Sequence, residues 1–358
     1  MLKFKLYRIF LYFKHLAYYY KLTNQYRKEI IKKTRGNDKI LNNRQISEIQ
    51  LFYSKFGFNK INTLWHEFYY SSNKIYSVKY IPEDIFHAVI SNRFNEMRQW
   101  PSLLDKNLLY ELFRDYKQPD VVLRNINSFF YVGNKIVSKE DAIKRIASEQ
   151  SQMIIKPSIE SGNGSGIIVF SSNAGNISYN GLSIKDFLNS YKKDFIIQKL
   201  VHQHENLKKL NESSLNTLRV LSYLNQDGVN ILSIILRIGK KGSFTDNCST
   251  GGIACGLSDI GLLKKYGFLN DGTVRTATDN GCKLENTQVP SFELVKEQIK
   301  EMHLLIPYFR IVSWDIGIDT TGTPVLIEYN TYHQDITIHQ LANGPLFGRF
   351  TEEILLHK

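Results

Sequence analysis

The sequence of 358 residues is longer than one hydrophobic core usually supports, so we expect two or three structural units. A hydrophobic content of 42% with 13% aromatic residues is typical of globular proteins and excludes an intrinsically disordered chain. No apolar run reaches the length of a membrane-spanning helix. Three cysteines without a CxxC pair argue against a disulfide framework or a zinc site and favour a reducing, cytoplasmic location.

The net charge of +12 is concentrated at the start of the chain. Residues 1–28 contain seven lysines and arginines, no acidic residue and many large apolar residues, and the internal charges argue against a secretory signal peptide. One interpretation is a basic helix lying peripherally on the surface of an anionic membrane. The other is a helix docked on its own domain with solvated lysines. No nucleic-acid-binding motif occurs, so we expect no nucleic acid partner.

Hydrophobic periodicity divides the chain into a helical front and a strand-rich remainder. Helical spacing covers residues 40–57 and 102–116. The expected fold class is α+β, with a helix-rich region at 1–100 and two further units at 101–200 and 201–358. The pattern also predicts helices over residues 138–150 and 345–358, and strands over residues 121–126, 128–133, 152–157, 166–170, 194–201, 215–224, 230–239, 312–319 and 324–330.

A glycine-rich loop, SGNGSG at residues 161–166, lies between two expected strands and follows Lys156. The loop has no large side chain, so its backbone N–H groups can close over an anion. A lysine at its entrance can neutralise phosphate oxygens. The loop is neither a P-loop nor a dinucleotide fingerprint, because neither G-K-[ST] nor a helical pattern follows it. By itself, the pattern is also compatible with a hairpin loop and a solvated lysine.

The segment SWDIGIDTTGTPVLIEYN predicts a hairpin whose turn is centred on Thr321 and Gly322. This register pairs Asp315 with Glu328 across the two strands, both among apolar neighbours. Like charges directly opposite each other destabilise a hairpin, so we expect a cation between them. Asn330 lies two residues after Glu328 and therefore on the same face. Two carboxylates and an amide oxygen suit Mg²⁺ shared with phosphates, and the alternative is a solvent-facing hairpin.

Together these motifs resemble the ATP-grasp superfamily, which implies two α+β subdomains that clasp ATP, with ATP and Mg²⁺ as cofactors. The resemblance extends from about Asp105 to Asn330 and rests on five motifs in the same order. It implies that Lys106 and Lys156 bind the nucleotide and that Glu205 holds its ribose. It further assigns residues to the flexible loop (Ser161, Gly162, Gly164, Ser165 and Gly166), to the adenine-binding strand (Gln198, Lys199, Leu200 and Val201) and to the metal site (Asp315, Glu328 and Asn330).

Three segments between these motifs resemble more narrowly the sugar-transfer-associated ATP-grasp proteins of polysaccharide gene clusters. They are NTLRV with Arg219, ILRIG with Arg237, and DNCSTGG with Asn247. The resemblance implies that Asn247 contacts the nucleotide. D-alanine–D-alanine ligase is similar in its core motifs only, and Ser313 stands where that enzyme has an arginine two residues before its magnesium aspartate. Arg219 and Arg237 are the candidates to replace that arginine.

The resemblance implies a ligase in which an acceptor carboxylate attacks the γ-phosphate of ATP. Lys156, Arg219 and Arg237 offset the charge, and an amine then attacks the acyl phosphate to give an amide. The expected substrates are the carboxylate of a sugar acid or sugar nucleotide and a small amine or amino acid, in bacterial surface polysaccharide biosynthesis. An ATP-dependent phosphotransferase and a non-catalytic ATP-binding scaffold are the alternatives. His333 and His339 follow the metal motif, and each is a candidate for facing the amine or for capping the loop.

Overall fold

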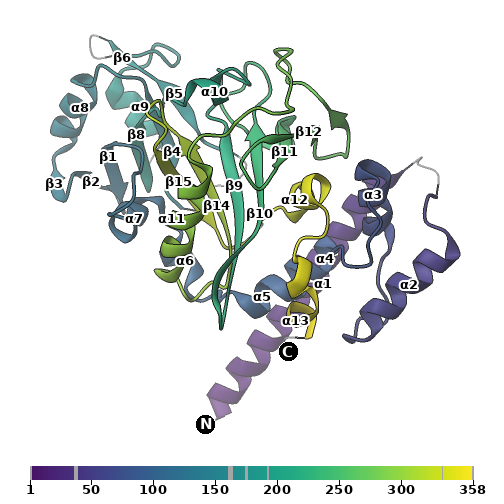
Figure 1. Ribbon diagram of the computed structural model, residues 1–358. Helices are drawn as coiled ribbons and strands as arrows, with labels where there is room; N and C mark the ends of the chain where they lie inside the picture. The colour runs from purple at the N-terminus through teal and green to yellow at the C-terminus, as the bar shows by residue number, and fades with distance from the viewer. Residues whose placement is uncertain are drawn as a thin grey trace.

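The computed structural model describes residues 2–35, 39–159, 164–173, 176–191, 193–332 and 334–356, with side chains from residue 17 onward except at residue 101. A six-stranded and a seven-stranded antiparallel sheet form the body, and N-terminal helices pack against the seven-stranded sheet (Figure 1). This arrangement confirms the predicted α+β class. Within the described part of the chain, no helix combines the length and the apolar character needed to cross a membrane.

The first third of the chain is helical. It contains α1 (Leu2–Thr34), α2 (Asn43–Ser54), α3 (Leu64–Asn73), α4 (Glu83–Ile85), the π-helical η1 (Phe86–Ile90), α5 (Ser91–Phe94), α6 (Trp100–Leu103) and α7 (Lys106–Leu112). The single helix predicted over residues 102–116 is therefore wrong. Asp105 interrupts it, because its backbone is extended and its side chain accepts the N–H of Asn107 at 2.9 Å, which caps α7.

The six-stranded sheet has the strand order β3-β2-β1-β8-β4-β5. Its elements and their flanking segments are β1 (Val121–Ile126), β2 (Phe129–Val132), β3 (Lys135–Val137), α8 (Lys139–Ala147), β4 (Met153–Pro157), β5 (Ile168–Phe170), β6 (Ser172–Asn173), β7 (Asn176–Ile177), α9 (Ile184–Tyr191) and β8 (Phe195–Lys199). Helices α8 and α9 supply Ile146 and Phe187 to the core of this sheet. Lys156 lies on β4, next to the central strand β8.

The seven-stranded sheet has the order β13-β12-β11-β10-β9-β14-β15. This half of the chain contains α10 (Glu205–Lys208), β9 (Thr217–Asn225), β10 (Gly228–Ile238), η2 (Cys248–Thr250), β11 (Ile253–Leu257), β12 (Leu263–Phe268), β13 (Val274–Arg275), α11 (Phe292–Leu304), β14 (Ile311–Ile318), β15 (Pro324–Asn330), α12 (Ile336–Asn343), η3 (Gly348–Phe350) and α13 (Thr351–Leu356). Alternate residues of its strands face two cores. Leu236 packs with Ile299 of α11, whereas Ile235 packs with Leu341 of α12.

The β14–β15 hairpin has the predicted pairing of Asp315 with Glu328 but a different turn. Near the turn, Ile318 pairs with Pro324, and the N–H of Asp319 donates to the carbonyl of Thr323 at 3.0 Å. The loop is therefore residues 320–322, one residue longer than the predicted two-residue turn. Gly322 ends this loop with φ of 84°, the left-handed conformation that such a longer turn requires. A bulge between Asp315 and Ile316 restores the register, so both carboxylates still lie opposite each other.

The second half of α1 is part of the protein core. Leu22, Tyr26 and Ile30 are buried and pack with Trp65 of α3 and Ile235 of β10. In Figure 1 the beginning of α1 extends away from the body of the molecule. The helix-docking interpretation therefore holds for the second half of this helix, and the membrane interpretation concerns the first half.

Candidate active site

Two buried arginines converge on one carboxylate at the centre of the seven-stranded sheet. Arg219 on β9 lies opposite Asp315 on β14, and its Nε and a terminal nitrogen donate to Oδ1 and Oδ2 at 2.9 and 2.8 Å. Arg237 on β10 adds a contact of 3.1 Å to Oδ2. Burial alone would raise the pKa of Asp315, but the charges of Arg219 and Arg237 hold it below its ordinary range. Arginines thus supply positive charge beside Asp315.

The loop after β10 is tied to this cluster through Asp246. Its Oδ1 lies 3.2 Å from Arg237, and its Oδ2 accepts both the backbone N–H of Thr217, at 3.1 Å, and the Thr217 hydroxyl. The neighbouring Asn247 accepts the N–H of Ser249 at 3.0 Å and caps η2. Asn247 was the predicted site residue of this motif, yet Asp246 is the residue that contacts the arginine. Asp246 could have been recognised from the sequence, because it is the one charged residue of the DNCSTGG motif.

Two lysines from the first half of the chain place positive charge near Glu328 of the outer strand β15. Lys106, at the start of α7, has its Nζ 3.5 Å from Glu328 Oε2, and its N–H donates to the carbonyl of Ser158 at 2.9 Å. Lys156 on β4 is only 7% exposed, so it is not the solvated lysine of the hairpin-loop alternative. Burial and then the charge of Lys106 lower the pKa of Lys156 to about 8. Positive charge carried by β4 and α7 therefore acts on Glu328 of the other sheet.

The glycine-rich loop is described in part. Ser161 and Gly162 lie outside the described residues, whereas Gly164, Ser165 and Gly166 lie within them. Gly164 and Gly166 have φ of 74° and 73°, in the left-handed region that favours glycine. The backbone conformation therefore accounts for glycine at both positions.

The described part of this loop approaches both sheets. A Cβ atom at Gly166 would lie 2.9 Å from Pro157 at the end of β4. A Cβ atom at Gly164 would lie 3.1 Å from Thr245, which directly precedes Asp246. The loop thus lies between the strand of the phosphate-binding lysine candidate and the segment that contacts the arginines.

The predicted adenine-binding segment lies where the chain leaves β8, and it comprises Gln198, Lys199, Leu200 and Val201. Gln198 is buried, and its Oε1 has no hydrogen-bond partner among the described residues. The Nζ of Lys199 lies 3.4 Å from Glu149. The chain then crosses to the seven-stranded sheet, and Glu205, the candidate for holding ribose, is exposed at the first position of α10. Just after this segment, the N–H of His204 donates to the carbonyl of Ile318 on β14 at 2.9 Å, so the predicted adenine-binding segment lies where the chain passes from one sheet to the other.

The predicted oxygen donors for a divalent cation are Asp315, Glu328 and Asn330. The oxygens of Asp315 already accept three arginine contacts, whereas Glu328 and Asn330 are partly exposed. In the part of the chain that the structure describes, no group of three or more His, Cys, Asp or Glu side chains is arranged to hold a metal ion. Mg²⁺ usually takes one or two protein carboxylates and completes its shell with phosphates and water. The three oxygen donors fit an ion that is bound together with a nucleotide.

Two further residues, which follow the hairpin in the sequence, add to this cluster. Asp335 directly precedes α12, and His339 lies one turn further along the helix; the charge of Arg219 acts on both. His339 was a sequence-based candidate, whereas Asp335 was missed. The sequence feature that could have indicated Asp335 is an aspartate five residues after Asn330. His333 lies outside the described residues.

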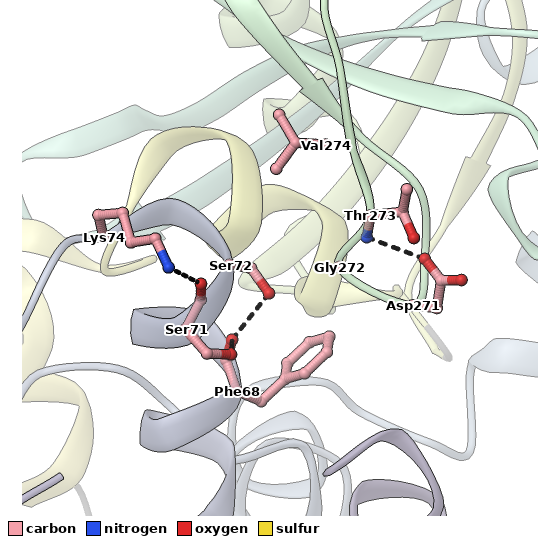
Figure 2. Close-up of a pocket in the computed structure, with 8 residues that line it drawn as sticks. All are labelled: Phe68, Ser71, Ser72, Lys74, Asp271, Gly272, Thr273 and Val274. Atoms are coloured by element: carbon pink, nitrogen blue, oxygen red, sulfur yellow. Dashed lines mark hydrogen bonds between the residues drawn. The ribbon is translucent and has the colours of Figure 1, made fainter. Parts of the chain in front are cut away.

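A separate surface hollow of about 310 Å³ lies between α3 and the turn before β13 (Figure 2). Its polar groups pair with one another: Lys74 donates to the carbonyl of Ser71 at 2.6 Å, and the N–H of Thr273 donates to Asp271 at 2.9 Å. A Cβ atom at Gly272 would lie 2.4 Å from a serine hydroxyl of α3. This hollow therefore lies where α3 packs against the turn before β13, and its polar groups are already paired.

Several solved structures show partial similarity to this chain. The ATP-grasp ligase PsnB, solved with a minimal precursor, Mg and ADP, shares 13% identity at a TM-score of 0.42, covering 74% of this chain and 61% of its own. L-amino acid ligase from Bacillus licheniformis shares 11% identity at a TM-score of 0.42, with coverages of 87% and 59%. N5-carboxyaminoimidazole synthetase from Staphylococcus aureus shares 8% identity at a TM-score of 0.40, with coverages of 72% and 52%. This chain thus spans less than two thirds of each of these proteins.

No curated protein matches the sequence. The family described as sugar-transfer associated ATP-grasp matches residues 86–354, which is well over half of the chain. This match confirms the resemblance that the order of the motifs predicted, and with it the ATP-grasp fold. The chain therefore belongs to the sugar-transfer-associated ATP-grasp family.

Proposed function

We propose that this protein is an ATP-dependent carboxylate–amine ligase that acts through an acyl phosphate. The observation that carries the proposal is the charge arrangement between the two sheets. Four basic side chains meet three carboxylates there, and the ion pairs that join them are Lys106–Glu328, Arg219–Asp315, Arg237–Asp315 and Arg237–Asp246, with Lys156 buried nearby. Such a cluster suits a triphosphate and an acidic acceptor, because both bring negative charge into a partly desolvated space.

The residues of the chain have separate roles in this proposal. Lys156 and Lys106 bind phosphate oxygens, and the loop containing Gly164 covers them and limits the access of water. Asp315, Glu328 and Asn330 would hold Mg²⁺ together with the nucleotide, and the ion would supply charge neutralisation at the phosphates. Arg219 and Arg237 fix Asp315 and keep positive charge beside the reacting groups. The acceptor carboxylate oxygen bonds to the γ-phosphorus as the bond to the β–γ bridging oxygen breaks and ADP leaves.

We further propose that the acceptor is a carboxylate on a sugar or sugar nucleotide, such as a uronic acid, and that the nucleophile is a small amine or amino acid. Membership in a sugar-transfer-associated family supports the sugar. The net charge of +12 supports an acidic, phosphate-bearing substrate. The same considerations favour a role in surface polysaccharide biosynthesis.

The test is to incubate the protein with MgATP, hydroxylamine and a panel of uronic acids and their nucleotide sugars. Hydroxylamine traps an acyl phosphate as a hydroxamate, so we expect a hydroxamate that requires both ATP and one class of acid. A phosphorylated sugar without hydroxamate would instead identify a phosphotransferase. ATP binding without ADP release across the panel would identify a non-catalytic scaffold.

A further inference from the structure

Asp335 occupies the position directly before α12 but does not cap the helix. Aspartate is favoured at this position because its carboxylate accepts a backbone N–H of the first turn. Here the backbone of Asp335 is left-handed, with φ of 52° and ψ of 68°, and its side chain makes no capping hydrogen bond. A residue other than glycine in this conformation costs on the order of 1 kcal/mol and is most frequent at functional sites. Asp335 as a whole is partly exposed, and its carboxylate is not used by the helix that follows it.

His339 lies on the same face of α12, one turn after Asp335. Its Nδ1 is 2.9 Å from the hydroxyl of Ser233 on β10. Its side chain is fully buried, and its Nε2 has no hydrogen-bond partner among the described residues. Burial, followed by the charges of Arg219 and Arg237, lowers the pKa of His339 to about 3, so the imidazole is neutral. A buried polar nitrogen without a partner is costly, which favours a ligand as the partner of Nε2.

The loop that carries Asp335 is held firmly against the start of β14. The side chain of Gln334 donates to the carbonyl of Ile311 at 2.7 Å. The side chain of Asn95 donates to the carbonyls of Thr331 and Ile311 at 2.6 and 2.9 Å. Asp335 therefore has a fixed position relative to the strand that carries the metal-site candidate, as a reacting group requires.

Charges from three elements act on Asp335. They come from Glu83 of α4, Arg219 of β9, and Lys33 and Glu29 of α1. Burial, and then the negative charge of Glu83, raises the pKa of Asp335, and Arg219 opposes this effect. A carboxylate with a raised pKa accepts a proton more readily near neutral pH.

We propose, on the basis of the ligase function above, that Asp335 and His339 form the site of the attacking amine, with Asp335 as its general base. An ammonium group enters beside Asp335 and gives one proton to the carboxylate. The freed nitrogen lone pair attacks the acyl carbon, the C–N bond forms, and the bond from that carbon to the phosphate oxygen breaks. Inorganic phosphate leaves, and the second amine proton is released to the phosphate. His339 Nε2 accepts a hydrogen bond from the amine and orients it.

The test compares two nucleophiles on the variant Asp335→Asn. Hydroxylamine is largely unprotonated at neutral pH and needs no base, whereas glycine, L-alanine and L-lysine are protonated and need one. We expect hydroxamate formation within about threefold of wild type and amide formation reduced by about a hundredfold or more, the range of a lost general base. Raising the pH should partly restore amide formation in the variant, because it deprotonates the amine in solution.

Two further variants extend the test, and a third serves as the control. Asp335→Gly also removes the carboxylate but accepts the left-handed backbone, so it should fold at least as well and show the same loss. His339→Asn keeps a polar group near Ser233 and removes Nε2, so it should raise KM for the amine more than it lowers kcat. Asp271→Asn changes the same charge at the hollow of Figure 2 and should leave both reactions unchanged.

The outcomes separate this inference from the proposed function. Absence of hydroxamate in the wild type would contradict the proposed ligase function, and the assignment of Asp335 and His339 would fall with it. Normal hydroxamate with normal amide formation in Asp335→Asn would overturn the inference alone. An equal loss of both products would also overturn it, because Asp335 would then act on carboxylate activation.

Discussion

Arg219 and Asp315 form a two-point ion pair across neighbouring strands, although 96 residues separate them in the sequence. The contacts of 2.9 and 2.8 Å use the planar fork of the guanidinium, and both side chains are buried. Only arginine matches a carboxylate in this way, because a lysine ammonium is a single point charge. The pair also sets the charge at the candidate metal site, since Asp315 is one of its three oxygen donors.

Replacing Arg219 with lysine should therefore reduce turnover by about tenfold or more, equivalent to about 1.4 kcal/mol of transition-state stabilisation. The affinity for MgATP should change much less, because Lys156 and Lys106 remain. The measurement is the steady-state rate of ADP release together with the thermal shift produced by MgATP. Arg98 makes the same two-point contact with Glu96, but at the protein surface. Arg98→Lys is therefore the matched control and should leave the rate of ADP release unchanged. Equal effects of the two substitutions would contradict the prediction.

The variants Asp315→Asn and Glu328→Gln should differ in stability. Asparagine at 315 leaves two buried guanidinium groups without their shared carboxylate, so unfolding in urea should show a loss of about 3–5 kcal/mol. Glu328 is partly exposed and pairs with Lys106 at 3.5 Å, so its loss should cost about 1 kcal/mol or less. Both variants should lose magnesium-dependent turnover. Full activity in either would contradict the assignment of the oxygen donors.

Asp315 should also contribute to acid sensitivity. Its pKa is lower in the folded protein than in the unfolded chain, so its stabilisation is present above the ordinary aspartate value of about 3.9 and is lost as pH falls below it. The urea midpoint of the wild type should thus decline more steeply in acid than that of Asp315→Asn. Parallel declines would show that other carboxylates dominate.

Lys156 should couple nucleotide binding to proton uptake. Its pKa in the free protein is lowered to about 8, and bound phosphates should raise it, because they favour the charged ammonium. Binding of MgATP at a pH above 8 should therefore take up a proton, and affinity should fall as pH rises further. Calorimetry in buffers of different ionisation enthalpy measures the uptake.

The matching substitution is Lys156→Ala, which should abolish both the proton uptake and the stabilisation by MgATP. For the wild type, that stabilisation should be about 2.7 kcal/mol at a hundredfold excess over Kd. Lys135→Ala, at an exposed position on β3, is the control and should behave as wild type. Unchanged melting of the wild type in saturating MgATP would contradict nucleotide binding at this site.

The two halves of α1 should respond differently to change. Removing residues 1–16 should abolish binding to phosphatidylglycerol vesicles and leave the MgATP effect unchanged, because Leu22, Tyr26 and Ile30, which make the described core contacts of this helix, remain. Ile30→Ala should instead lower stability by about 2–5 kcal/mol, since Ile30 is fully buried. Co-sedimentation with anionic and with zwitterionic vesicles measures the first effect. Failure of the full-length protein to bind anionic vesicles would remove the membrane proposal.

Much of the fold and part of the site followed from local sequence patterns. Short apolar runs predicted nine strands of the two sheets, because a buried strand needs apolar side chains along its length. The prediction missed β3, β11, β12 and β13. The pairing of Asp315 with Glu328 also came from local spacing. That prediction assumed a two-residue turn, whereas the structure has a longer loop that ends at Gly322. A one-residue bulge compensates for the longer loop, so the predicted pair is still formed. The motif order was enough to predict the family.

The tertiary structure decided which charges meet. The spacing of residues along one hairpin cannot show that Arg219, Arg237 and Asp246 surround Asp315, because their approach depends on the order of the strands in the sheet. Nor can it show that α12 returns across this sheet and brings Asp335 close enough for the charge of Arg219 to act on it. Local geometry fixes neighbours within a hairpin or a helical turn, whereas electrostatic partners from distant segments are fixed only when the hydrophobic cores pack the sheets and helices together.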